Sequence, residues 1–577
     1  MCTKSMHRIL TPWLVATVCL VWFAQRGVAQ KGPDVAPLFR ISGSATITGD
    51  VYDFSSSPDG SEQPRRPANL WRFLLNPVIT IGDAVTLPFT IMLSTRETST
   101  IVPALRAPTF LQFLQNPANN LGVLSFSPRV GWAKASLGSH VPTYSELSTG
   151  NEQLFGLGLD LKPGFFRIAV NGGASQRAIE ADSANGIRGS YARRMYAMKL
   201  GYGQDAGSFI DVNIVRAKDE ASSVQKRPKG LAPEEGLVFT TNYRIRLADA
   251  ASITGEVGGS AFTRDLGSEL ANVKTPVPGW LYRHRISTST DFAGTLMFNY
   301  TEKSWGVKAG SKYIGAGYFS LAYPYMQPDR LDFLLAPYLK VFKSRLAMNG
   351  SIGYRTNNLS KTKDATSHQI IGSFNAFALV SENVSVNTRF ANYGIRNRMA
   401  VDTLKLDMVT NSFSVSPTVT IPTRTLVNTF MVNFSIDAYN EINTLTASER
   451  SNNTTSVMGM YMANFTGIPL SANLTGMLMK NDVPNNELTL LSATAGVSYR
   501  FLNGALRPSA SATWSVNSLA SYTADRQFLF RVGAQCDLGP SLALGLFGSM
   551  NSYRYGSTRP GVSFRESFLE SSLSVTF

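Results

Sequence analysis

Residue types that perform catalysis or bind metals are scarce in this chain and stand far apart. It contains four histidines and three cysteines. His140, His284 and His368 lack nearby Cys, His or Glu partners at the spacing of metal ligands, and neither a glycine-rich phosphate loop nor a GxSxG sequence occurs. Cys536 lies on the apolar side of an alternating segment, where cysteine packs as a small apolar residue. The sequence therefore predicts no catalytic residue, no metal site and no cofactor, and we do not expect an enzyme.

Charged residues on the polar side of alternating segments offer a different chemistry. They are Arg167, Lys199, Asp211, Arg244, Arg246, Arg500 and Arg531. In a water-filled lumen such charges are solvated and set ion preference. Alternatively, they form pairs between strands that stiffen the wall. The net charge of +15 favours anionic partners, such as lipopolysaccharide phosphates and anionic solutes, and nucleic acid is not expected.

Alternating segments must position these charges. In "LFGLGLDL", Phe155, Leu157 and Leu159 share one face and Asp160 lies on the other, which is the period of a β-strand. Similar segments continue to the C-terminus, separated alternately by twelve short turns and thirteen longer polar connections. This rhythm predicts an all-β fold, a transmembrane antiparallel up-and-down β-barrel of about 26 strands, within a range of 22 to 26.

The N-terminal stretch "MCTKSMHRILTPWLVATVCLVWFAQRGVAQ" has a basic start, an apolar middle and small residues at Gly27 and Ala29. These features predict a cleaved secretory signal peptide over residues 1–29. Residues 30–38 are then a short periplasmic N-terminus and 39–577 the barrel. We expect the protein in the outer membrane of a Gram-negative bacterium.

The last strand carries Leu573, Val575 and Phe577 on one apolar face. The stretch "LESSLSVTF" resembles the C-terminal signature of bacterial outer-membrane barrels, which implies recognition by the barrel insertion machinery. Residues 126–173 resemble a segment that recurs in large, mostly uncharacterised outer-membrane proteins of the Bacteroidota and Chlorobi type. This second resemblance rests on Ser127, Pro128, Arg129, Leu137, Gly138 and the turn Lys162-Pro163-Gly164. It implies a barrel in such an envelope and carries no activity with it.

Residues 97–120 are less polar than an exposed loop should be. Phe110, Phe113 and Leu114 share one face of a predicted short helix. Barrels of this width are known to hold a plug, and no separate plug domain is expected before residue 39. We therefore expect 97–120 to fold inward as a constriction, while a loop across the rim or a part of the wall remain alternatives.

Together these features predict an outer-membrane channel or porin-like transporter for passive or gated passage of small solutes. Its expected partners are outer-membrane lipid, lipopolysaccharide and the insertion machinery. The alternative is a non-catalytic barrel that acts as a scaffold or export component for an unidentified protein partner or for lipopolysaccharide. A TonB-dependent receptor is disfavoured because no plug is expected.

Overall fold

The computed structural model describes residues 39–57, 62–82, 85–94, 124–150, 152–182, 188–225, 230–273, 275, 277–398, 407–441, 451–484, 486–520 and 522–577. The predicted signal peptide (1–29), the segment 30–38 and the predicted constriction (97–120) lie outside these ranges. Besides strands, the described residues form two short 3-10 helices, Ala221–Ser223 and Leu502–Gly504. No helix in the described ranges has the length and apolar character needed to cross a membrane.

The strands follow one another along the whole described chain. Their bounds are β1 Phe39–Ser56, β2 Asn69–Ile81, β3 Val85–Ser94, β4 Leu124–Phe126, β5 Arg129–Val130, β6 Ala133–His140, β7 Leu154–Leu161, β8 Phe166–Gln176, β9 Ala192–Gly203, β10 Phe209–Glu220, β11 Glu235–Arg246, β12 Ala251–Thr263, β13 Thr288–Thr301 and β14 Trp305–Ile314. The second half comprises β15 Arg330–Val341, β16 Leu346–Asn357, β17 Thr366–Ser381, β18 Val384–Arg398, β19 Asp407–Pro422, β20 Leu426–Glu441, β21 Asn452–Phe465, β22 Leu470–Val483, β23 Asn486–Tyr499, β24 Leu506–Leu519, β25 Asp525–Gly539, β26 Leu542–Arg554 and β27 Ser563–Thr576.

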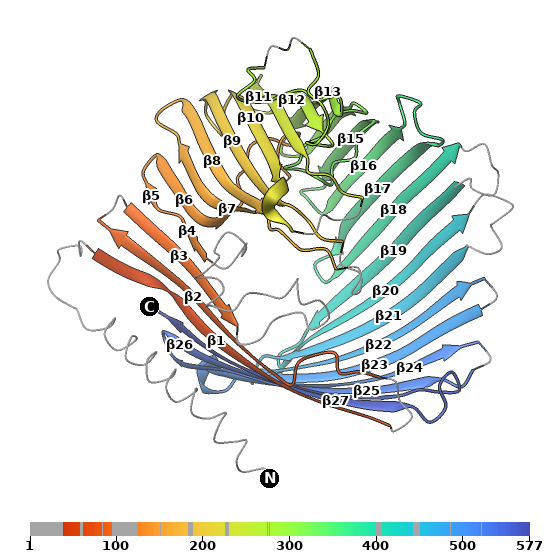
Figure 1. The fold of residues 1–577 in the computed structure, drawn as a ribbon. Coiled ribbons are helices and arrows are strands. Elements are labelled where there is room, and N and C mark those ends of the chain that lie inside the picture. Colours follow the sequence, from red (N-terminus) through yellow and green to blue (C-terminus); the bar gives the residue numbers. More distant parts are fainter. Residues whose placement is uncertain are drawn as a thin grey trace.

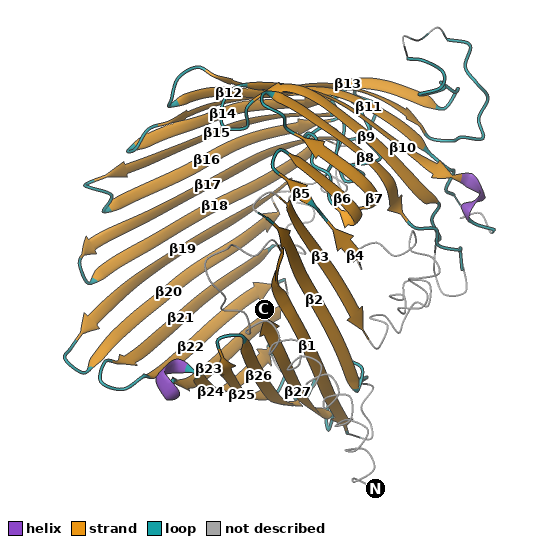
Figure 2. Cartoon of the chain, turned by 90° about the vertical axis from the view of Figure 1, so that its left-hand side faces the viewer, coloured by secondary structure: helices purple, strands orange, loops and turns teal. Residues whose placement is uncertain are grey.

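These strands form one antiparallel sheet that closes on itself (Figures 1 and 2). Apart from β4 and β5, each strand pairs with its neighbours in the chain, and β27 pairs with β1. Of the 27 strands in the described residues, the short β4 and β5 both lie between β3 and β6 and share one place in the wall. The remaining count of 26 positions confirms the predicted all-β, up-and-down barrel and its strand number.

The two faces of the wall differ in chemistry, as β9 illustrates. Its even-numbered residues Tyr196, Met198, Leu200 and Tyr202 point outward and are 47–57% exposed. The odd-numbered residues of the same strand point inward and include Lys199. A closed barrel with an apolar outer face is the form in which β-strands cross a membrane, so the fold is a transmembrane barrel.

The seam between the first and last strands is fully paired. The register runs from Ser44 opposite Thr576 to Ser56 opposite Phe564. Beyond the strand, Phe577 exchanges two backbone hydrogen bonds with Gly43, of 2.7 and 3.0 Å. Leu573 and Val575 are 5% and 1% exposed. The C-terminal residues are therefore part of the wall, and closure leaves no free sheet edge.

Candidate functional site

A row of nine residues, six of them charged, crosses the inner wall from β8 to β16. The strand register places its members directly beside one another, in the order Arg167, Gly201, Asp211, Asn242, Glu256, Thr295, Lys312, Asp332 and Arg355. We call these nine residues the inner charged row. Cations and carboxylates both occur along it, and opposite charges on nearby strands attract. The row therefore stiffens this arc of the wall and makes its inner surface polar.

Arg167 and Asp211 form the best-shielded ion pair of the row. The Arg167 Nε and Nη2 atoms donate to the two Asp211 carboxylate oxygens at 2.7 and 3.0 Å. Their side chains are 10% and 1% exposed. Gly201 lies between them in the register, and a Cβ atom there would stand 2.0 Å from Asp211 Oδ1. Glycine at 201 thus leaves the space through which the guanidinium reaches the carboxylate.

Further charges from the short turns surround this pair. Asp205, in the β9–β10 turn, accepts hydrogen bonds from Arg167 Nη1 and from Lys162 Nζ. The hydrogen bond from Lys162 and then that from Arg167 lower the pKa of Asp205 to about 2. Lys199 Nζ lies 4.0 Å from Asp211, and Arg244 Nη1 donates to the Asp205 carbonyl oxygen at 2.8 Å. Four cations therefore surround two carboxylates, and we call these six residues the inner ion cluster.

The connection between β6 and β7 folds inward and crosses the inner wall. Tyr144 donates its hydroxyl hydrogen to the Ala197 carbonyl oxygen at 2.8 Å and accepts a hydrogen bond from Asn171 Nδ2 at 2.7 Å. Burial raises the pKa of Tyr144 to about 12. Three residues further along, Leu147 N lies 3.2 Å from both carboxylate oxygens of Glu256. Residues 141–150 are thus fixed across strands β8 to β12.

The connection between β14 and β15, residues 315–329, also lies inside the barrel and holds the first loop. Tyr318 donates its hydroxyl hydrogen to the Leu147 carbonyl oxygen at 3.0 Å. Ser320 Oγ donates to the Ser148 carbonyl oxygen at 2.6 Å. Gly150 N donates to the Ala322 carbonyl oxygen at 3.0 Å. We call residues 141–150 and 315–329 the inner loops, because they form one hydrogen-bonded unit against the wall.

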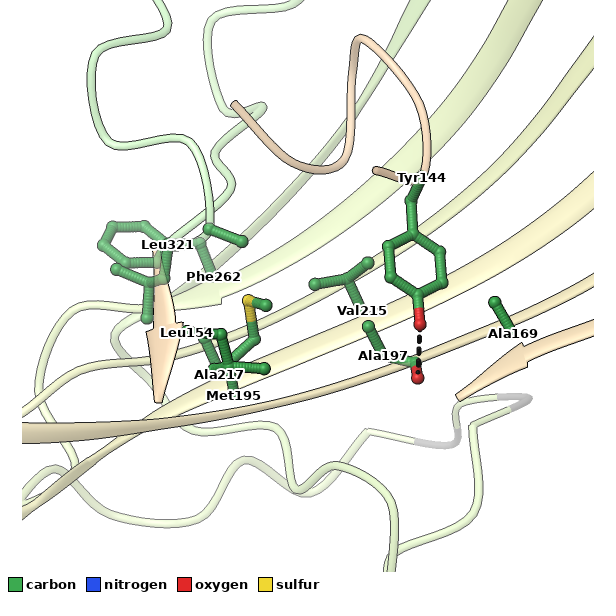
Figure 3. Close-up of a cluster of buried hydrophobic side chains, with 10 residues drawn as sticks. Tyr144, Leu154, Ala169, Met195, Ala197, Val215, Ala217, Phe262 and Leu321 are labelled. Carbon is green, nitrogen blue, oxygen red and sulfur yellow. Dashed lines mark hydrogen bonds between the residues drawn. The ribbon is translucent and has the colours of Figure 1, made fainter. Parts of the chain in front are cut away.

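Apolar packing secures the inner loops to β7–β12. Figure 3 shows Tyr144 and Leu321 of the loops around a buried cluster on the inner wall. The wall contributes Leu154, Ala169, Met195, Ala197, Val215, Ala217 and Phe262. Phe319 stacks on Phe262 with ring centroids 5.1 Å apart. This packing explains why apolar residues occur on inner positions here, where a bare lumen would favour polar ones.

A pocket of about 580 Å³ opens beside the inner loops. Ser145 and Glu146 border it from the loop, and Arg244, Glu256, Lys312, Asp332 and Arg355 border it from the wall. Lys312 Nζ forms an ion pair with Glu146 Oε1, and Arg355 binds Asp332 through two hydrogen bonds of 2.8 and 3.0 Å. The pocket thus presents both signs of charge to the lumen. No group of three or more His, Cys, Asp or Glu suited to a metal ion occurs in the described ranges.

The structure brings four of the seven lumen charges predicted from sequence into one cluster and leaves three apart. Arg167, Lys199, Asp211 and Arg244 belong to the inner ion cluster. Arg246 pairs with Asp249 in the next turn, where both are exposed. Arg500 follows the end of β23 and is exposed. Arg531 is exposed on the inner side of β25, opposite Ser511 and Ser549.

The proposed constriction residues Phe110, Phe113 and Leu114 lie outside the described ranges. Sequence reasoning did not identify the inner loops, although both fall in connections that it placed correctly between strands. The feature that could have predicted them is the apolar and aromatic content of "YSELSTG" and "GYFSLAYPYM", which is unusual for exposed loops. It also missed Lys312, Asp332 and Arg355, because period-2 alternation gives the face of a residue but not its neighbours on the next strand.

Neither a protein-family model nor a curated protein matches this chain. Among solved structures, Pseudomonas aeruginosa OpdK with vanillate aligns with a TM-score of 0.30 and 10% identity, over 60% of this chain and 93% of that chain. The translocation pore of the P pilus usher PapC aligns with a TM-score of 0.34 and 11% identity, over 94% and 100% of the two chains. The E. coli P pilus tip assembly intermediate PapC-PapD-PapK-PapG gives 0.44 and 10%, over 95% of this chain and 62% of that chain. Likeness at these values assigns no activity.

Proposed function

We propose that this chain is a channel in the outer membrane of a Gram-negative bacterium and passes small solutes through its lumen without covalent chemistry. The observation that carries the proposal is the pair of inner loops fixed across strands β8 to β12 of a closed transmembrane barrel. Hydrogen bonds and ion pairs hold these loops, and their edge bears exposed charge at Glu146. A fixed, charged segment inside a barrel restricts size and selects by charge.

The charge balance supports a preference for anions. In the inner ion cluster four cations surround two carboxylates, and Arg531 adds an exposed cation on the inner side of β25. Apart from Arg244, which already belongs to the cluster, the charged residues that line the pocket are two cations and three carboxylates, so they offset one of the two excess positive charges of the cluster. Fixed positive charge along an aqueous lumen concentrates anions and repels cations. The inner wall therefore favours anionic solutes.

The test is single-channel recording in planar bilayers under a salt gradient, on protein shown to be folded by heat-modifiable migration. We expect steady conductance with an anion-biased reversal potential. Arg531→Glu should move the reversal potential toward cations. Arg526→Glu is the matched control, because it makes the same charge change on the same strand at the opposite, outer-facing parity, and it should leave the reversal potential in place.

Silence from folded protein would refute the channel and favour the alternative, a scaffold or export barrel for a protein partner or lipopolysaccharide. Partner co-purification would then be the next measurement. The sequence-based proposal that 97–120 narrows the lumen is tested by the same recording on a chain that lacks these residues, where conductance should rise.

The remaining proposals concern placement in the membrane. Lipid and lipopolysaccharide would contact the apolar outer face, and the insertion machinery would recognise Leu573, Val575 and Phe577 in the last strand. Support comes from their position at the closing seam, next to β1. Changing Phe577 to Ser should reduce the amount of folded barrel in the membrane without altering the conductance of the barrels that form.

A further inference from the structure

Six methionines lie next to one another on three consecutive strands of the wall. They are Met431 on β20, Met458, Met460 and Met462 on β21, and Met477 and Met479 on β22. In "VMGMYMA" and "GMLM" they occupy every second position, so all those on one strand share a face. The chain has 17 methionines in total, and more than a third of them meet here.

The strand register brings these side chains together across strands as well as along them. Met431 is opposite Met460, and Met458 is opposite Met477. Met479 lies two residues further along, opposite Ser456 on the same face. Cβ atoms of directly opposite residues are about 4.5–5.5 Å apart, and Met is long and flexible enough to adjust the position of its sulfur. Thioether sulfurs from two or three strands can therefore converge on one point.

This face of the strands is the inner one. Ser456, which has the same parity as the three methionines of β21, shares a hydrogen bond of 2.7 Å with Ser435. The opposite parity carries exposed apolar residues of the outer band, among them Val457, Leu474 and Leu478 at 40–55% exposure. All six methionines are partly exposed. A patch of thioethers thus faces a lumen whose inner positions are ordinarily polar.

The surroundings of the patch suit a cation. Within the described strands β20 to β23, no Lys or Arg occupies an inner-facing position, so these strands themselves place no positive charge beside the patch. Asp437 lies on the inner side of β20, three alternate positions from Met431. Thioethers are soft, neutral ligands that select Cu(I) over hard divalent cations. Nothing in the apolar packing of the inner loops accounts for these residues, since that packing involves β7 to β14.

We propose that this methionine patch is a binding site for a soft monovalent cation, Cu(I) or Ag(I), on the inner wall of the barrel. The ligands are the thioether sulfurs of Met458 and Met477, joined by Met431, Met460 or Met479. The inference rests on the inward orientation of β20–β22 and not on the conductance of the barrel. A barrel that passes no current can still bind the ion, so failure of one proposal is distinguishable from failure of the other.

Ag(I) is the probe, because it has the same charge and softness as Cu(I) and does not change oxidation state under assay conditions. The mature chain carries the Cys536→Ala substitution, which removes its thiol, and is equilibrated with silver nitrate in chloride-free detergent solution. Bound silver is measured after gel filtration, and X-ray absorption identifies the atoms around it. We expect saturable retention with sulfur neighbours.

Met458→Leu/Met460→Leu/Met477→Leu should weaken this retention by about tenfold or more, which corresponds to a loss of about 1.4 kcal/mol of binding free energy. Leucine keeps the volume and apolar character of methionine, so the barrel should fold. The matched control is Met198→Leu/Met550→Leu, which removes two outward-facing thioethers and should leave silver retention unchanged.

The leucine variant also separates metal binding from binding of an apolar solute. An apolar fluorescent probe should bind the wild type and the leucine variant equally, because both present an apolar patch. Silver retention that persists in the leucine variant would overturn the proposal, as would oxygen or nitrogen neighbours in the absorption spectrum. Binding of the apolar probe without any binding of silver would reassign the patch to apolar solutes.

Discussion

Gly150 is the position at which the smallest change should separate the inner loops. A Cβ atom added there would lie 2.2 Å from Tyr323 Cδ2 and 2.5 Å from Cγ. Real Cβ atoms essentially never approach another heavy atom closer than 3.0 Å, and these are ring atoms near the base of the side chain. The Gly150→Ala substitution therefore forces residue 150 and Tyr323 apart.

The size of the effect follows from the contacts that join the two loops. Three hydrogen bonds link them, from Gly150 N, Ser320 Oγ and Tyr318 Oη. At about 1 kcal/mol each, loss of all three costs about 3 kcal/mol. That energy raises the population of the separated arrangement by roughly 150-fold. The barrel itself should stay folded, because the strand ladders do not involve these groups.

Hydrogen exchange and conductance both report this separation. In Gly150→Ala the amides of 145–150 should exchange faster, and channel recordings should show larger or noisier conductance. Gly459→Ala is the matched control, since a Cβ atom at Gly459 would meet no atom within 4 Å. It should behave as the wild type in both measurements.

A second substitution isolates the clash as the cause. In a Tyr323→Ala background the ring is gone, so Gly150→Ala should produce no further change in exchange. If Gly150→Ala leaves the exchange of 145–150 at the wild-type rate, or if its effect persists in the Tyr323→Ala background, the packing of Gly150 against Tyr323 does not hold the loops together.

Two further predictions concern the inner ion cluster. Arg167→Met leaves Asp211, at 1% exposure, without its main partner, and should lower the free energy of unfolding by about 3–5 kcal/mol. Urea unfolding in lipid vesicles measures this, and Arg167→Met/Asp211→Leu should regain most of the loss; an equal loss in the double variant would argue against a buried unpaired charge. Asp205 has a folded-state pKa of about 2 against an ordinary value of 3.8, so its stabilising contribution is fully present above the ordinary value and is lost as pH falls through about 2. Asp205→Asn should therefore reduce stability at pH 5 to 8 and have little effect near pH 2, and a constant difference between the two proteins across this range would exclude the ion pair as the cause.

The strands of the wall could be predicted from the sequence, because the alternation of apolar and polar residues along a barrel strand shows which side chains face outward and which face inward. Alternation in segments such as 154–161 gives the face of every residue, and the succession of short turns and long connections gives the order of the strands. The predicted number of strands matches the structure for this reason. Loop 141–150 obeys no such period. Its position depends on hydrogen bonds to Ala197 and Glu256, which are 53 and 109 residues away.

The sequence also did not show which charged side chains form ion pairs with each other. The sequence assigned Arg167 and Asp211 to the polar side of the wall, but their separation of 44 residues gave no indication that they form a pair across Gly201. That pair depends on the register of three strands, and the register is fixed by turn geometry that the sequence pattern does not specify to one residue. Alternation predicts the face of the sheet on which a side chain lies. Its contacts with side chains of neighbouring strands depend on the register of the closed sheet.

The same register separates the two chemical regions of the inner wall. The inner charged row ends at Arg355 on β16, and the methionine patch begins at Met431 on β20. Strands are about 4.8 Å apart, so four steps along the wall amount to roughly 19 Å, beyond the range at which substitutions usually influence one another. An anionic solute at the row and a soft cation at the patch would thus be bound by different strands. Residues of one site can be substituted while the other site serves as the internal control, because strands β17 to β19, which lie between them, supply residues to neither site.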